Sequence, residues 1–211
     1  TMEAGYDPAT GRYEYPSDDM STNYTPTYAL FHGTIGYTVE CGENNEASVT
    51  MGKYGLIGHT AYVAENKNDL YLNQLEFFRR ALNNEESPET EKWFVTQDNQ
   101  VEENFREKDE YGKFYPEYYV IPTDAASQRD IADAYFMQEY FIRNGVQVEK
   151  LTQDVTVNGV TYKAGAFVID MHQISRSFAN AVLYKGKIVK NWTGLFSESV
   201  TNFPELRGFD C

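Results

Sequence analysis

A charged, proline-bearing stretch separates the apolar segments of this chain into two groups. Residues 83–91 read NNEESPETE, and apolar segments lie on both sides of them. Domain boundaries fall in exposed polar segments that few contacts cross, so this stretch is the best candidate boundary. The 211 residues suffice for one large domain or two small ones. We predict one unit over residues 1–86, a linker over 87–115 and a second unit over 116–211.

The composition predicts a folded, acidic protein. Aromatic residues make up 15% of the chain and the net charge is −14. Such a surface repels phosphate backbones and anionic headgroups, so we expect no nucleic-acid partner and no membrane partner. No apolar run approaches the roughly 20 residues that span a bilayer. Two cysteines are too few for a disulfide framework or a cysteine-based zinc site.

The first unit is expected to combine loops, a strand and a helix. Residues 1–27 are rich in turn residues and tyrosine, and they predict an ordered loop. Residues 28–41 are dense in β-branched and aromatic residues, which predicts a strand with its lead-in. The glycine-bearing residues 42–58 predict another loop, and the apolar spacing over 59–82 predicts a helix.

The second unit is expected to be a small α/β domain with a β-hairpin. Residues 118–122 predict a buried strand, and Asp124 or Ser127 could cap a helix that runs through Asn144 and stops at Gly145. With a strand over 146–151, these elements predict a right-handed, parallel βαβ unit. Asn158-Gly159 between alternating residues predicts a type I′ hairpin, which a strand over 166–171 continues, before a short helix over 174–183.

Glu40 is the candidate catalytic residue. It lies at the carboxyl end of the predicted strand, just before a glycine-bearing loop, and sites assemble at such edges in α/β sheets. Partial desolvation there would raise the pKa of a carboxyl group toward a value useful for a general base. A solvated acid at a strand end is the alternative that position alone leaves open.

Residues 28–46, YALFHGTIGYTVECGENNE, and 55–82, GLIGHTAYVAENKNDLYLNQLEFFRRAL, are similar to the end of the catalytic domain in the M14 family of zinc carboxypeptidases. The resemblance covers roughly residues 1–83 and implies the C-terminal part of a carboxypeptidase-type mixed sheet. In that family the glutamate of a Thr-x-Glu strand ending is the general base that activates a zinc-bound water. The matching residues are Thr38 and Glu40.

The resemblance also implies a zinc cofactor, but this chain departs from the family in its metal ligands. The family's zinc site is a His-x-x-Glu pair with a distant histidine, and none of His32, His59 and His172 begins such a pair. We therefore expect no metal ligand in this chain. The zinc ligands and the arginines that hold the substrate carboxylate are expected upstream of Thr1, in a missing N-terminal part of the domain, and the chain alone is expected to be inactive.

The family also covers its substrate with a loop tyrosine that precedes the last strand. Four loop tyrosines stand before that strand here, and spacing does not choose among Tyr6, Tyr13, Tyr15 and Tyr24. We take Tyr13 and Tyr15, with Thr38, as candidate substrate-binding residues; aromatic packing within the loop is the alternative.

Other polar residues are expected to be structural. We predict that His32 is a buried, hydrogen-bonded histidine, that His59 is exposed at a helix start and that Cys41 is a buried thiol. His172 follows a predicted strand at a site-like edge, although no nucleophile pattern surrounds it. Residues 116–211 are similar in pattern to the class I glutamine amidotransferase-like domain that follows some bacterial peptidases. They place no cysteine at a strand-to-helix turn, so no amidotransferase activity is expected.

These patterns favour one function and leave two others open. The favoured one is part of a zinc metallocarboxypeptidase that hydrolyses C-terminal peptide bonds of peptide substrates, in a secreted or cell-surface bacterial protein. The second is a non-catalytic, secreted module in which tyrosines, Trp93 and Trp192 bind peptides or glycans. The third is an interaction domain that forms a homodimer or pairs with the missing part through an exposed sheet edge.

Overall fold

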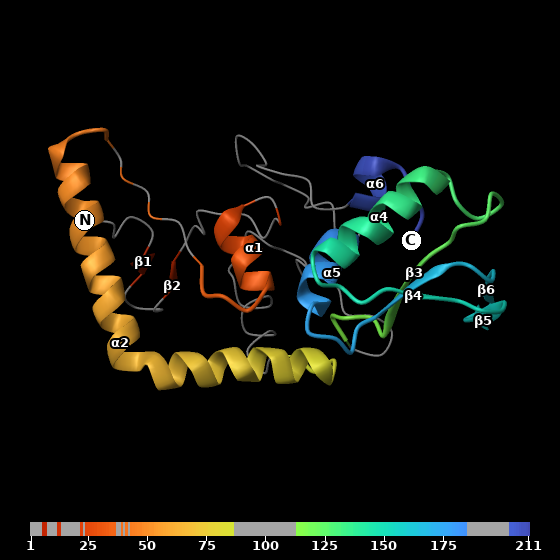
Figure 1. Ribbon diagram of the computed structural model, residues 1–211, viewed down its shortest axis with the longest axis horizontal. Helices are drawn as coiled ribbons and strands as arrows, with labels where there is room; N and C mark the ends of the chain where they lie inside the picture. The colour runs from red at the N-terminus through yellow and green to blue at the C-terminus, as the bar shows by residue number, and fades with distance from the viewer. Residues whose placement is uncertain are drawn as a thin grey trace.

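A computed structural model describes residues 6–7, 12–13, 22, 24–36, 39, 41, 43–86, 113–184 and 203–211. Helices dominate and three small antiparallel sheets accompany them, so the chain has the mixed α/β fold that its sequence predicts. Figure 1 shows a compact C-terminal unit at one end and the long helix α2 reaching away from it. The division into two domains joined by a linker stays a prediction.

The central sheet of the C-terminal unit has three strands in the order β3-β7-β4. β3 (Tyr118–Ile121) and β4 (Glu149–Lys150) both run antiparallel to β7 (Phe167–Asp170), which lies between them. The prediction of a strand over 118–122 is confirmed. Because both run antiparallel to β7, β3 and β4 are parallel to each other, as the predicted βαβ unit requires, but β7 lies between them and splits the motif.

Helix α4 (Ile131–Arg143) connects β3 to β4 and covers the sheet. It begins later than predicted: Asp130, rather than Asp124 or Ser127, is the N-cap, and its carboxylate accepts a hydrogen bond from the backbone N–H of Asp133. Gly145 takes a φ of 78°, as expected of the residue that ends a helix.

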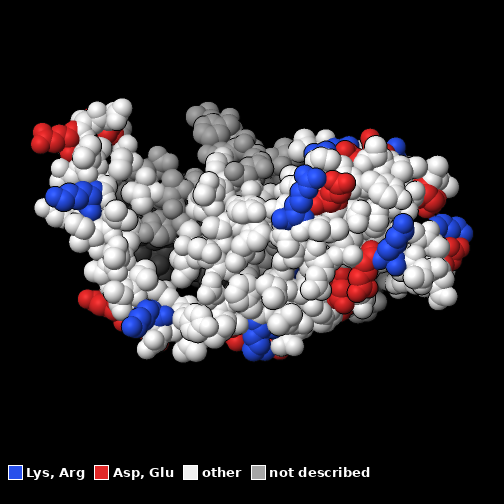
Figure 2. All heavy atoms as spheres, viewed as in Figure 1, with Lys and Arg blue, Asp and Glu red and all other residues white. Residues whose placement is uncertain are grey.

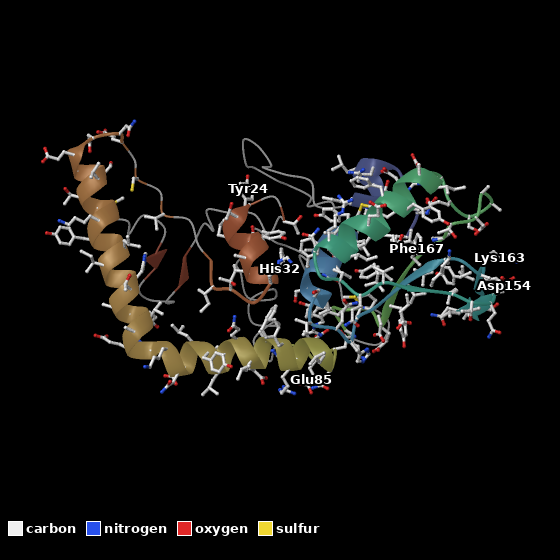
Figure 3. The ribbon with its side chains drawn as sticks, in the orientation of Figure 1. Tyr24, His32, Glu85, Asp154, Lys163 and Phe167 are labelled. Carbon is white, nitrogen blue, oxygen red and sulfur yellow. The ribbon has the colours of Figure 1, made fainter. Side chains whose placement is uncertain are left out.

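The hairpin β5–β6 is confirmed. β5 (Val155–Val157) pairs antiparallel with β6 (Val160–Tyr162), and Asn158 and Gly159 have φ values of 48° and 80°. Positive φ at both central residues is what a type I′ turn requires. The hairpin lies at the far tip of the unit, where Figure 3 shows Lys163 and Asp154 close together, with 2.8 Å between their charged atoms. The predicted strand over 166–171 is confirmed as β7 (Phe167–Asp170), but it pairs with β3 and β4 rather than with the hairpin.

The core of the C-terminal unit is closed by α5 (Arg176–Leu183) and α6 (Phe203–Arg207). The predicted short helix over 174–183 is thus confirmed, two residues shorter at its start. Fully buried side chains come from the sheet and the residue after it, from α4 and α5, and from the end of the chain: Ile121, Met137, Phe141, Ile169, Met171, Phe178, Val182 and Phe209. Phe31, from the N-terminal part of the chain, belongs to the same core.

Helix α1 (Thr25–Phe31) replaces the first part of the predicted strand over 28–41. Pro26 stands in its first turn, where the missing N–H and the fixed φ of proline suit a helix start. The helix also places Phe31 in the core, so tertiary packing overrides the β-branched and aromatic composition of this stretch. Residues 32–36, 39 and 41 are not in strands either, and 37, 38 and 40 lie outside the described residues.

Helix α2 (Glu46–Leu82) contains the predicted helix over 59–82 but begins thirteen residues earlier. The predicted loop over 42–58 is therefore wrong for most of its length. Asn45 caps the helix by accepting a hydrogen bond from the Ser48 N–H at 3.0 Å. Asn66 has non-helical backbone angles, and α2 is bent into two arms (Figure 1). Near the start of the chain the structure describes a short backbone ladder in which β1 (Tyr6–Asp7) pairs with β2 (Arg12–Tyr13).

Candidate functional site

Most of the predicted site residues lie outside the part of the chain that the structure describes. Glu40, Thr38 and Tyr15 are in this group. Tyr13 is in β2, where its backbone is opposite Tyr6 and its side chain is not described. The roles predicted for these four residues therefore stay predictions, and the described geometry concerns the segment that leads to Glu40.

The chain from α1 toward Glu40 is held tightly against both N-terminal helices. Gly33 has a φ of 79°, and a Cβ there would lie 2.3 Å from the ring of Phe78 on α2. A Cβ on Gly36 would lie 2.6 Å from the carbonyl oxygen of Pro26, at the start of α1. Gln74 of α2 donates a hydrogen bond to the Gly33 carbonyl at 2.6 Å. Two glycines and one amide thus fix this segment between α1 and α2.

His32 connects α1 to the C-terminal unit, as Figure 3 shows. Its Nδ1 lies 2.8 Å from the carbonyl oxygen of Tyr28, and its Nε2 lies 3.1 Å from the carbonyl oxygen of Asn144. The Tyr28 hydroxyl donates to the side-chain oxygen of Asn144 at 2.8 Å. The ring also packs on Phe178 of α5, with 5.1 Å between centroids. His32 is half-buried rather than buried as predicted, and both of its ring nitrogens lie within hydrogen-bond distance of backbone carbonyls.

His172 lies at the edge of the sheet between two carboxylates. Its Nδ1 is 2.9 Å from Asp170 Oδ1, which also accepts the His172 backbone N–H, and its Nε2 is 3.6 Å from Glu117 Oε2. Glu117 pairs with Lys113 through its other oxygen. These side chains are about two-fifths exposed. Ion pairs as exposed as these contribute little to the free energy of unfolding.

Arg176 joins the end of α2 to the start of α5, a contact that sequence reasoning missed. Its side chain is only 4% exposed, Nη1 donates to Asn84 Oδ1 at 2.9 Å, and Nη2 donates to the Glu85 carbonyl. The guanidinium lies 4.3 Å from the ring centroid of Tyr115. Burial lowers the pKa of Arg176, although a guanidinium remains charged at physiological pH.

The described residues do not fit a zinc site. No group of three or more His, Cys, Asp or Glu side chains in the described ranges is arranged to hold a metal ion. Both ring nitrogens of His32 face backbone carbonyls, and those of His172 face the carboxylates of Asp170 and Glu117. His59 lies exposed on α2, within the helix rather than at its start.

Two further sequence expectations concern the cysteines and the membrane. Cys41 is exposed, so its predicted burial is wrong, because the strand that would have turned it inward does not include it. Cys211 is half-buried and packs against the core. Within the described ranges, each helix is too short or too polar to cross a bilayer.

Comparison with known proteins returns no relative. No protein-family model, no curated protein and no solved structure matches this chain.

Proposed function

We propose that this chain is the closing part of a zinc carboxypeptidase catalytic domain, followed by an α/β accessory unit. The observation that carries the proposal is the order of the sequence: Thr38-x-Glu40, a short connection, and then a long helix. Helix α2 supplies a long helix in the place where the resemblance implies one. The same proposal holds that residues 116–211 resemble an amidotransferase domain in fold. It assigns them no amidotransferase activity.

In this proposal the chain supplies one catalytic group, the Glu40 carboxylate, and the segment that positions it. Gly33, Gly36 and Gln74 fix the backbone that leads to the Thr38-x-Glu40 segment. Glu40 accepts a proton from the attacking water and later gives it to the leaving amine, which is the work of a general base that becomes a general acid. None of His32, His59 and His172 begins a His-x-x-Glu pair, so the proposal assigns the metal ligands to protein outside this chain.

The first test is a release assay on peptides, with this chain joined to the upstream segment that the proposal requires. We expect single residues to be released from peptides with a free C-terminal carboxylate, and none from the same peptides with a C-terminal amide. A chelator should abolish release and added zinc should restore it, while residues 1–211 alone should release nothing. Cleavage of the amidated peptide at internal bonds, or no release by the longer protein, would refute the assignment.

A second candidate function is an interaction module, and the exposed surface of α2 favours it. Val49, Leu56 and Val63 are 72%, 70% and 52% exposed, and they recur at seven-residue spacing. Residues seven apart lie in one row along a helix, so these side chains form an exposed apolar row, and the occupant that fits it is α2 of a second copy. Figure 2 shows that much of the visible surface along α2 is uncharged, with acidic and basic side chains scattered over it.

The second candidate predicts self-association of the 211-residue chain. Light scattering over a wide concentration range should show a dimer that dissociates on dilution, and Leu56→Lys with Val63→Lys should shift the chain to monomer. Val160→Lys is the matched control, because this valine is 52% exposed on the hairpin, far from α2 along the chain, and should leave the dimer intact. A monomer at every concentration would exclude the second-copy arrangement.

A further inference from the structure

The contacts of His32 require more hydrogen atoms than a neutral imidazole carries. Its two ring nitrogens lie 2.8 Å and 3.1 Å from the backbone carbonyl oxygens of Tyr28 and Asn144. A carbonyl oxygen only accepts hydrogen bonds, and a neutral imidazole has a single N–H to donate. Both bonds exist together only when the ring is doubly protonated.

We propose that His32 is a proton-operated clasp that fastens α1 to the C-terminal unit when its ring is charged. Tyr28 belongs to α1 and Asn144 is the C-cap of α4, so the two bonds of one ring bridge these helices. When the ring loses a proton, one of the two carbonyls loses its donor and the bridge is reduced to a single bond. The inference rests on these contacts alone and does not depend on the proposed peptidase function.

The surroundings of the ring favour a cation. Carbonyl groups at the carboxyl end of a helix carry the negative end of its dipole, and the Asn144 carbonyl is at the end of α4. Aromatic faces add to the attraction, with ring centroids of Tyr28 at 4.4 Å and of Phe178 at 5.1 Å. The same partners place His32 between three helices, so loss of its charge is felt by α1, α4 and α5 together.

The other ionisable groups at this junction are two phenols and side chains that are paired or hydrogen-bonded. The phenols of Tyr28 on α1 and Tyr140 on α4 face it, and burial raises the pKa of Tyr140, so that ring stays neutral near pH 7. Further along α4, Glu139 and Arg143 pair with each other in solvent. On α5, Arg176 is held by Asn84 and Glu85. Among these side-chain types, imidazole is the one whose ordinary pKa lies between pH 5 and 8.

The direct test is nitrogen NMR of the His32 ring in the 211-residue chain. At pH 6 we expect both ring nitrogens to be protonated, with hydrogen-bond couplings to two carbonyls, and one of these couplings should disappear as the pH rises toward 8. A neutral ring with one unprotonated nitrogen facing a carbonyl at pH 6 would overturn the proposal. This measurement needs no variant, so it decides the question even where a substituted chain does not fold.

Hydrogen exchange measures how often α1 opens when the His32 ring loses its charge. The Gly33 and Thr34 amides bond to carbonyls of α1, and they report its opening. After correction for intrinsic exchange, their opening should increase about fivefold to tenfold between pH 6 and 8, as loss of one net hydrogen bond implies. His32→Gln should remove this pH dependence and His59→Gln should retain it. An identical pH profile in the wild-type chain and His32→Gln would overturn the clasp.

Discussion

Glu40→Gln is expected to abolish C-terminal release by the longer protein that contains this chain. Glutamine has nearly the shape of glutamate but cannot take a proton from water, so the variant removes the base and little else. General-base catalysis contributes about a hundredfold to ten-thousandfold, and the loss should appear in kcat with KM nearly unchanged. Steady-state kinetics on an unblocked peptide measures both constants, and zinc content should stay at its wild-type value.

Glu43→Gln is the matched control for this prediction. Glu43 stands three residues further along the chain, is exposed, and accepts a hydrogen bond from the Asn45 side chain at 2.8 Å. The same change of charge there should leave turnover near the wild-type value. Near-normal turnover in Glu40→Gln would rule out this residue as the base, and an equal loss in both variants would point to net charge rather than to Glu40.

Local chemistry predicted the turns and ends of the C-terminal unit correctly. Asn158-Gly159 and Gly145 require backbone angles that few other residues adopt, so the hairpin and the end of α4 follow from residue identity alone. The strand over 118–122 ends at Pro122 for a similarly local reason. These features depend on neighbours a few residues away, which a single sequence contains.

Pairing between distant segments could not be predicted in the same way. A strand followed by a helix and a strand usually pairs in parallel, and nothing local shows that β7 inserts between β3 and β4. The glycines at 52, 55 and 58 suggested a loop, yet they lie inside α2, where a Cβ at each would meet open space. α1 is helical although its composition favours a strand, because Phe31 packs into a core built mainly by later residues.

The candidate site shows the same contrast between local features and contacts between distant segments. The sequence identifies Glu40, Thr38, Tyr13 and Tyr15 through a motif and a resemblance, and their roles stay predictions. It gave no signal for the contacts that the structure describes between the two parts of the chain. His32 and Asn144 are 112 residues apart, and Arg176 and Asn84 are 92 residues apart, so no periodicity or spacing connects them.

Arg176→Met is expected to lower the free energy of unfolding by about 2–4 kcal/mol, because one buried and one partly buried acceptor lose a charged donor. The acceptors are Asn84 Oδ1 and the Glu85 carbonyl, and the methionine keeps most of the apolar contact with Tyr115. Removing the guanidinium also removes its own cost of burial, which is why the expected loss is smaller than the sum of the two bonds. Urea unfolding followed by tyrosine fluorescence measures the change.

Arg143→Met is the control for this substitution, since Arg143 is 76% exposed and pairs with Glu139 in solvent. It should change the free energy of unfolding by no more than about 0.5 kcal/mol.

A double-mutant cycle with Asn84→Gly isolates the bond itself. Asn84 has a φ of 48°, which glycine adopts without strain, so this variant removes the side chain without disturbing the backbone. If the contact joins α2 to α5, the double variant should be about 1.5–3 kcal/mol more stable than the sum of the single losses implies. Additive losses would mean that Arg176 stabilises the fold through Tyr115 and the core of the C-terminal unit, and that the end of α2 is not fastened there.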